Sequence, residues 1–269
     1  MTGGSLLAAI DANRDDLDAY RVYADWLIQT GDPWGQVIAV QHALRTLPRF
    51  GQTARRDELE REETRLLYEH RRRLWGPLAD AVFDAATQTR VSDLVEATWV
   101  CGFVDTIRIH RASAGLLATL LPALAKLEIM SHVRALDLDA TEWTRAACEA
   151  LAGQAWPNVH ALAIRSFDTP IDARWVAPAL DAMLALRELS VVNSHSTDGL
   201  CFAIAVHPVG DRLVALQLFD GQFTAAGIGA LSGGKFRKLG KLAVTGSGPD
   251  NARALLARTA RHITVRFEA

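Results

Sequence analysis

Cysteine is scarce in this chain of 269 residues, and the few cysteines form no metal-binding or disulfide pattern. Cys101, Cys148 and Cys201 lie 47 and 53 residues apart, so the sequence has no CxxC pair. A sparse, odd set of this kind is typical of buried free thiols in a reducing compartment. The sequence therefore predicts three buried, unpaired cysteines.

Long apolar runs and an excess of one charge are also missing. No stretch approaches the ~20 apolar residues that a membrane-spanning helix needs, and residues 1–10 lack the basic start of a signal peptide. Lysine and arginine number 29 and aspartate and glutamate 31, for a net charge of −2. Binding to the phosphates of a nucleic acid would need an excess of lysine and arginine clustered on one surface. We expect a cytoplasmic protein that binds neither membranes nor nucleic acid.

Sequence motifs of catalysis are missing as well. The eight histidines show no HxxxH or HExxH spacing, which a zinc protease would need. GxSxG, Walker-type GxxxxGK[ST] and GxGxxG motifs do not occur. The sequence therefore favours a non-enzymatic protein with no metal or cofactor. The enzymatic alternative would require a closed polar pocket around His110, Asp137 and Asp139.

The sequence contains a repeat of the form apolar-x-x-apolar-x-apolar. Five copies centre on Leu136, Leu162, Leu189, Leu216 and Leu242, and successive centres are 26, 27, 27 and 26 residues apart. Weaker copies flank them at 104–109 and 260–265. A near-constant period of this length indicates a repeat architecture.

Each repeat predicts one strand and one helix. The last two apolar residues of each copy are two apart, so both point to the same face of a strand. Helical stripes run between the strands, as at 116–124 and 175–183. The expected N-caps of three helices are Thr197, Thr224 and Asp250. Because no unit can bury its apolar face alone, neighbouring units must stack.

This pattern resembles degenerate leucine-rich repeats in a ribonuclease-inhibitor-like solenoid, although the consensus Asn or Cys is missing from the turns. The resemblance implies an α/β fold with parallel strands on a concave face and helices outside. About six to seven strand–helix units would span residues 77–269.

Residues 1–76 contain no such strands and predict an all-helical unit. Gly31 is expected to end the second helix and Pro33 to begin the third. A charged helix is expected at 53–75, with leucines facing the core at Leu59, Leu66, Leu67 and Leu74. Its arginines at 71–73 could form a basic patch for an acidic partner, but a solvated helix face is favoured.

Residues 21–27 (RVYADWL), followed by Gly31-Asp32-Pro33, Gly35, Ile38 and Gln41, resemble the bacterial repeat-companion domain. This short helical module precedes leucine-rich repeats and related proteins, and the similarity covers roughly residues 5–45. Residues 99–104 (WVCGFV) are similar to the W-x-x-G-F-V run that opens such repeats, with Cys101 where a basic residue is expected. The resemblance implies a helical cap at 1–76 and no catalytic residue. We expect the aromatic residues of the string to pack helices together.

The residues that point out of the predicted strands form the candidate binding site. They are Arg108, His110, Asp137, Asp139, Arg165, Val192, Gln217 and Phe219. The set is charged toward the N-terminus, whereas toward the C-terminus an exposed Phe beside Val is typical of a protein-binding surface. Alternatively, a cap or loop covers these side chains.

Together these features predict a scaffold or recognition protein that binds an unidentified protein partner through the concave strand face. The alternative is a recognition or regulatory subunit of a bacterial defence or signalling effector, such as a protease, kinase or toxin. In that case the effector would dock on the helical cap.

Overall fold

The computed structural model of the protein describes residues 2–48, 50–82, 94–166, 169, 171–193 and 198–267. Contacts within the chain divide it into two compact units. One unit contains Met1–Ser92 and Ala97–Asp105, and the other contains Asp93–Glu96 and Thr106–Ala269. None of the described helices is long and apolar enough to cross a membrane.

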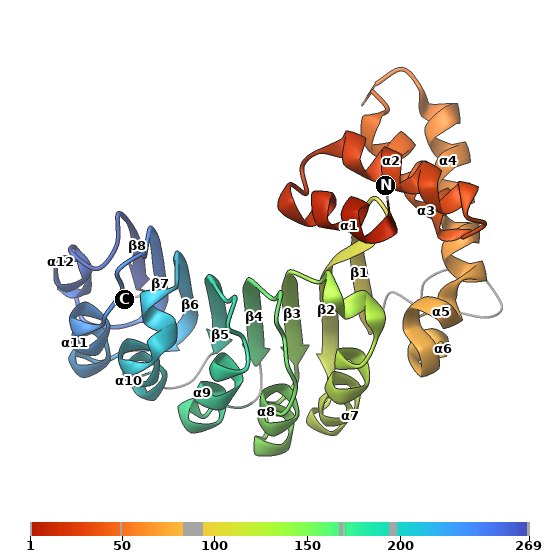
Figure 1. Ribbon diagram of the computed structural model, residues 1–269. Helices are drawn as coiled ribbons and strands as arrows, with labels where there is room; N and C mark the ends of the chain where they lie inside the picture. Colours follow the sequence, from red (N-terminus) through yellow and green to blue (C-terminus); the bar gives the residue numbers. More distant parts are fainter. Residues whose placement is uncertain are drawn as a thin grey trace. The chain divides into compact units, whose positions relative to one another are not determined.

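The first unit is helical (Figure 1). Its elements are α1 (Gly3–Ala12), α2 (Leu17–Gln29), α3 (Trp34–Thr46), α4 (Thr53–Glu69), α5 (Arg71–Trp75), the 3-10 helix η1 (Gly76–Leu78) and α6 (Ala79–Val82). The charged segment 53–75 forms two helices and not the expected single one, because the backbone leaves the helical conformation at His70. The four leucines predicted to face the core are buried, which confirms that prediction.

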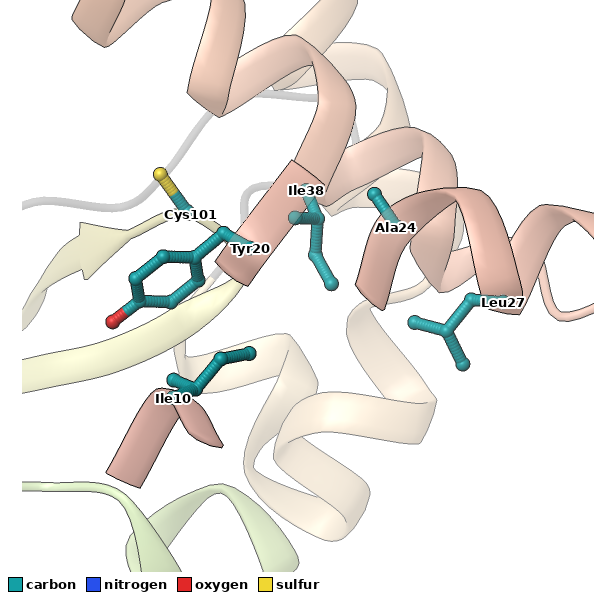
Figure 2. Packing of buried hydrophobic residues seen from close by; sticks show 6 residues of the cluster. All are labelled: Ile10, Tyr20, Ala24, Leu27, Ile38 and Cys101. Atoms are coloured by element: carbon teal, nitrogen blue, oxygen red, sulfur yellow. The ribbon is translucent and has the colours of Figure 1, made fainter. Parts of the chain in front are cut away.

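A small apolar core joins α1, α2 and α3 (Figure 2). It consists of Ile10, Tyr20, Ala24, Leu27, Ile38 and Cys101. The Tyr20 ring meets the edge of Phe103 with 5.7 Å between ring centroids. Tyr23 stacks on Trp26 at 6.0 Å and on Phe103 at 6.1 Å. The aromatic residues of the RVYADWL string therefore pack against other parts of this unit, as expected.

The GDPWG string connects α2 to α3. Its Asp32 carboxylate accepts a hydrogen bond from the Trp34 backbone N–H at 2.9 Å. The same carboxylate binds both terminal nitrogens of Arg73, at 2.7 and 2.9 Å, and this hydrogen bonding lowers the pKa of Asp32 below its ordinary value. Gly35 has no room for a side chain, because a Cβ atom there would lie 2.6 Å from the Ala24 carbonyl oxygen. The string thus allows α2 and α3 to approach closely.

A two-residue turn at Cys101 and Gly102 joins two strands that the repeat pattern did not predict as a pair. These strands are β1 (Val95–Val100) and β2 (Phe103–Ala112). Both turn residues have positive φ, +44° and +86°, as in the type I′ turns that suit hairpins. Residues of α3 contact the turn: Trp34 Nε1 donates to the Gly102 carbonyl at 3.1 Å, and Gly102 N–H donates to Gln41 at 2.5 Å. A Cβ atom on Gly102 would lie 2.3 Å from Ile38.

The second unit is an α/β structure. Its further strands are β3 (Ala135–Ala140), β4 (Ala161–Ser166), β5 (Glu188–Asn193), β6 (Ala215–Gln222), β7 (Lys241–Ser247) and β8 (His262–Phe267). The described strands form one eight-stranded sheet in chain order, and each pair from β2 to β8 is parallel.

Between the strands lie helices, and α7 to α11 line one side of the row of strands (Figure 1). They are α7 (Ala114–Ala125), α8 (Arg145–Ala152), α9 (Ala173–Asp181), α10 (Asp198–Val206), α11 (Ala225–Gly233) and α12 (Ala252–Leu256), with 3-10 helices η2 (Glu128–Ser131) and η3 (Pro208–Asp211). This alternation of strand and helix explains the parallel sheet, because each connection must cross back before the next strand begins.

The central leucines of the five repeats stand opposite one another in the sheet. Pairs of adjacent strands align Leu136, Leu162, Leu189, Leu216 and Leu242. Each of the five is at most 1% exposed. Ile107 and Ile263 continue the row on the strands at either side. The register predicted from the 26–27-residue period is therefore confirmed.

Two of the three expected N-caps can be compared with the structure, and Thr197 lies outside the described residues. Thr224 caps α11 by accepting a hydrogen bond from Ala226 N–H at 3.1 Å, as predicted. The prediction for Asp250 was wrong by one residue, because a turn at 249–252 places Asn251 at the N-cap of α12.

All three cysteines are free and buried, which confirms the prediction. Burial raises the pKa of each thiol, and it does so to about 12 for Cys148 and for Cys201. Neighbouring carboxylates add to this shift, Asp172 beside Cys148 and Asp198 beside Cys201.

Replacing Leu189 by alanine should lower the free energy of unfolding by about 2–5 kcal/mol, because it leaves a cavity in the centre of the leucine row. Urea denaturation followed by circular dichroism measures the change. Ser190→Ala is the matched control on the other face of the same strand, where we expect a change within about 0.5 kcal/mol. A loss below about 1 kcal/mol for Leu189→Ala would contradict the buried row.

The thiols should make stability depend on alkaline pH. The pKa values of the thiols are raised in the folded state. Their contribution to the free energy of unfolding is therefore complete below the ordinary thiol pKa of 9.0 and is lost as pH rises toward 12. We expect the melting temperature to fall between pH 8 and 10.5. The fall should be smaller in a Cys148→Ala, Cys201→Ala double variant measured alongside. Equal slopes for the two proteins would disprove the thiol contribution.

Candidate binding face of the sheet

The eight residues predicted to bind a partner lie on one face of strands β2 to β6, here called the open face. They are Arg108 and His110 on β2, Asp137 and Asp139 on β3, Arg165 on β4, Val192 on β5, and Gln217 and Phe219 on β6. Along each strand they alternate with the buried apolar residues, so they point to the opposite side of the sheet. Six of them are half-buried, whereas Asp137 and Asp139 are buried.

The strand register arranges seven of these eight residues in two rows of the open face. One row contains Arg108, Asp137, Ala163, Ser190, Gln217 and Ala243. The other contains Asp139, Arg165, Val192 and Phe219. Neighbouring members stand on adjacent strands, about 4.8 Å apart. Within these two rows, the charged groups lie on β2 to β4, and β5 and β6 present uncharged groups.

Asp137 lies between two arginines. Its Oδ2 accepts a hydrogen bond from Arg108 Nε at 2.7 Å, which raises the pKa of Arg108 above its ordinary value. Its Oδ1 is 2.8 Å from a terminal nitrogen of Arg165, a close ion pair without hydrogen-bond geometry. Two guanidinium partners explain how this carboxylate can be buried, with only 7% of the residue exposed.

The charged cluster extends to Glu96 on β1, which the sequence did not suggest. Glu96 Oε2 lies 3.5 Å from Arg108 and 3.2 Å from His110 Nε2. Glu96 was missed because β1 precedes the first repeat and no period predicts it. The alternation of apolar Val95 and Ala97 with Glu96 is the signal that could have revealed this strand.

Asp139 differs from Asp137 although both belong to β3. It is 9% exposed, and its Oδ1 atom accepts no hydrogen bond from any residue that the structure describes. Its Cα partner on the next strand is Arg165, whose guanidinium pairs with Asp137. Among the described residues of the open face, Asp137 is thus a buried carboxylate with two cationic partners, whereas Asp139 pairs with neither arginine.

Val192 and Phe219 form the apolar end of the open face, where they stand opposite each other on β5 and β6. Both are half-buried, so Phe219 is less exposed than the sequence suggested. β6 leaves its regular register just after Leu218, and Asp220 adopts a φ of +59° there. Phe219 therefore stands at the start of a bulge, with part of its surface still accessible.

The described residues include no group of three or more His, Cys, Asp or Glu side chains arranged to bind a metal ion. A cavity of about 720 Å³ lies on the helix side of the sheet, between α9 and α10. Apolar and small residues line most of it, including Ile171, Ala177, Leu200 and Ala203. The charged cluster of the open face is thus separate from this cavity.

No protein-family model matches the chain, and no curated protein matches it. Among solved structures, the chain is similar to a Bacteroides fragilis protein whose crystal structure comes from a structural genomics consortium. The alignment covers 51% of this chain and 41% of that one, at 15% sequence identity and a TM-score of 0.41. The match thus spans less than half of that protein's length.

Replacing Asp137 by asparagine should lower the free energy of unfolding by about 1–3 kcal/mol, because the two arginines would lose their shared carboxylate. Urea denaturation measures this loss. Gln217→Ala, in the same row but outside the charged cluster, is the control and should change stability by less than about 0.5 kcal/mol. Similar values for the two variants would show that the ion pairs do not stabilise the sheet.

Proposed function

We propose that the chain is a non-enzymatic recognition protein that binds another protein through the open face. In this proposal the second unit is a leucine-rich-repeat solenoid, and the first is a repeat-companion-type cap. The protein acts in the cytoplasm, needs no cofactor and binds neither membranes nor nucleic acid. The observation that supports it best is the register of the repeats, which lines up outward-pointing side chains across five strands.

The composition of the open face supports protein binding. A cluster of ion pairs lies beside a half-buried Val and Phe, and interfaces between proteins combine apolar anchors with surrounding polar groups in this way. The strands also offer a rigid base, because a continuous buried row of leucines lies under the side chains. A partner would therefore meet a surface whose geometry is already in place.

Two matched variants test this proposal by affinity capture from an extract of the source organism. Phe219→Ala, combined with Arg165→Ala, removes an apolar and a charged group from the open face. Phe202→Ala, combined with Arg174→Ala, removes the same side-chain types from α10 and α9 on the helix side of the sheet. We expect the first variant to lose at least about 90% of a captured protein, as for two interface anchors. The second should retain it. Equal capture by both would contradict binding through the open face.

The alternative is that the helical unit docks an effector enzyme and the chain acts as its recognition or regulatory subunit. One observation favours it: Val22 and Ile28 on α2 are large apolar side chains that are 43% and 47% exposed, so they could contact a partner. A Val22→Glu, Ile28→Glu variant distinguishes the two proposals. Loss of the captured protein in this variant, with full capture by the Phe219 variant, would support docking on the helical unit.

A further inference from the structure

From the open face we infer the chemistry of its partner: a protein segment that places a lysine or arginine at Asp139 and an apolar side chain at Val192 and Phe219. This inference rests on the proposed function, because it specifies what the open face recognises. It starts from Asp139, a buried carboxylate whose Oδ1 atom receives no hydrogen bond from the described residues and which, unlike Asp137, forms no ion pair with Arg108 or Arg165.

Asp139 stands out because a buried carboxylate normally has partners. Taking an ionised group out of water costs several kcal/mol unless hydrogen bonds or an opposite charge compensate. Asp137, two residues earlier on the same strand, has two guanidinium partners. More than nine-tenths of Asp139 is buried, and no residue that the structure describes donates a hydrogen bond to its Oδ1 atom. An unsatisfied polar group of this kind needs an explanation, and a partner that supplies the missing donor is one.

Asp139 takes no part in the ion pairs that the described residues form on this face. Glu96 lies beside Arg108 and His110, and Asp137 pairs with Arg108 and Arg165. Both guanidinium groups already pair with Asp137. The position is therefore complementary to one additional cation, and it would repel the phosphates of a nucleic acid or an anionic lipid.

The spacing of the open face selects a protein segment as the source of that cation. Asp139, Arg165, Val192 and Phe219 stand in one row on four successive strands. Asp139 is thus separated from Val192 by about 10 Å and from Phe219 by about 14 Å. An extended segment advances about 3.3 Å per residue, so its basic and apolar residues would lie roughly three to five positions apart. A small polyamine could supply the charge but not the apolar contact.

The first test compares the stability of two variants without any partner. Asp139→Asn should leave the melting temperature unchanged or raise it, because a carboxylate kept for binding does not stabilise the free protein. Asp137→Asn should lower the melting temperature by about 3–6 °C, because it breaks existing ion pairs. An equal decrease for Asp139→Asn would make Asp139 a structural residue and would overturn the inference.

The second test uses a displayed library of random dodecapeptides selected against the full chain. Enriched peptides should contain a lysine or arginine three to five positions from an aromatic or aliphatic residue. Synthetic versions should bind Asp139→Asn at least about tenfold more weakly, and replacing the basic residue of the peptide should cost the same factor. When the Asp139→Asn variant is tested with the substituted peptide, the loss of affinity should be close to that of either change alone, because both remove the same contact. Spermidine should not compete at equal concentration.

Asp181→Asn is the matched control for charge, because Asp181 lies on α9, on the helix side of the sheet. Peptide affinity should not change in this variant. Peptides that lose affinity with Phe219→Ala but not with Asp139→Asn would support the proposed function and overturn the inference. If no enriched peptide responds to either substitution, the open face does not bind protein segments, and the proposed function fails together with the inference.

Discussion

The stacking of apolar strand faces is the interaction on which the second unit depends. A single strand–helix repeat cannot bury the apolar face of its strand alone, so the neighbouring repeats must help to cover it. The row of leucines from Leu136 to Leu242, at most 1% exposed, is the result. Each leucine removed from water contributes roughly 1.5–3 kcal/mol. The stability of each repeat therefore depends on the repeats beside it, and a defect in one repeat weakens those on both sides.

The same stacking determines the open face, because consecutive residues of a strand point to opposite sides. Burial of Leu136 and Leu138 places Asp137 and Asp139 on the other side of β3. There the two carboxylates have different surroundings, since Arg108 and Arg165 both turn to Asp137. In a binding surface, a carboxylate without a paired cation would discriminate between partners, because a partner without a cation leaves it uncompensated.

In the helical unit, the residues of the RVYADWL and GDPWG strings have structural roles. Tyr23 and Trp26 pack as aromatic neighbours, Asp32 links a helix start to Arg73, and Gly35 permits close approach of α2 and α3. The hairpin turn at Gly102 is bound by side chains of α3. Motifs of this kind can be distinctive without being catalytic, because tight packing and fixed turns restrict residue choice as strongly as chemistry does.

The local periodicity of the sequence was enough to predict much of the second unit. The period of 26–27 residues predicted the strands, their register and the outward positions of eight side chains, because a strand alternates its faces with a period of two. Tertiary structure alone decided the rest. β1 and its Glu96 have no repeat signal, the break at His70 opposes a continuous helical pattern, and the burial of Asp139 depends on groups that are distant in sequence. Arg165 stands opposite Asp139 in the sheet but pairs with Asp137. This pairing depends on side-chain geometry between strands, which the spacing of residues in the sequence does not encode.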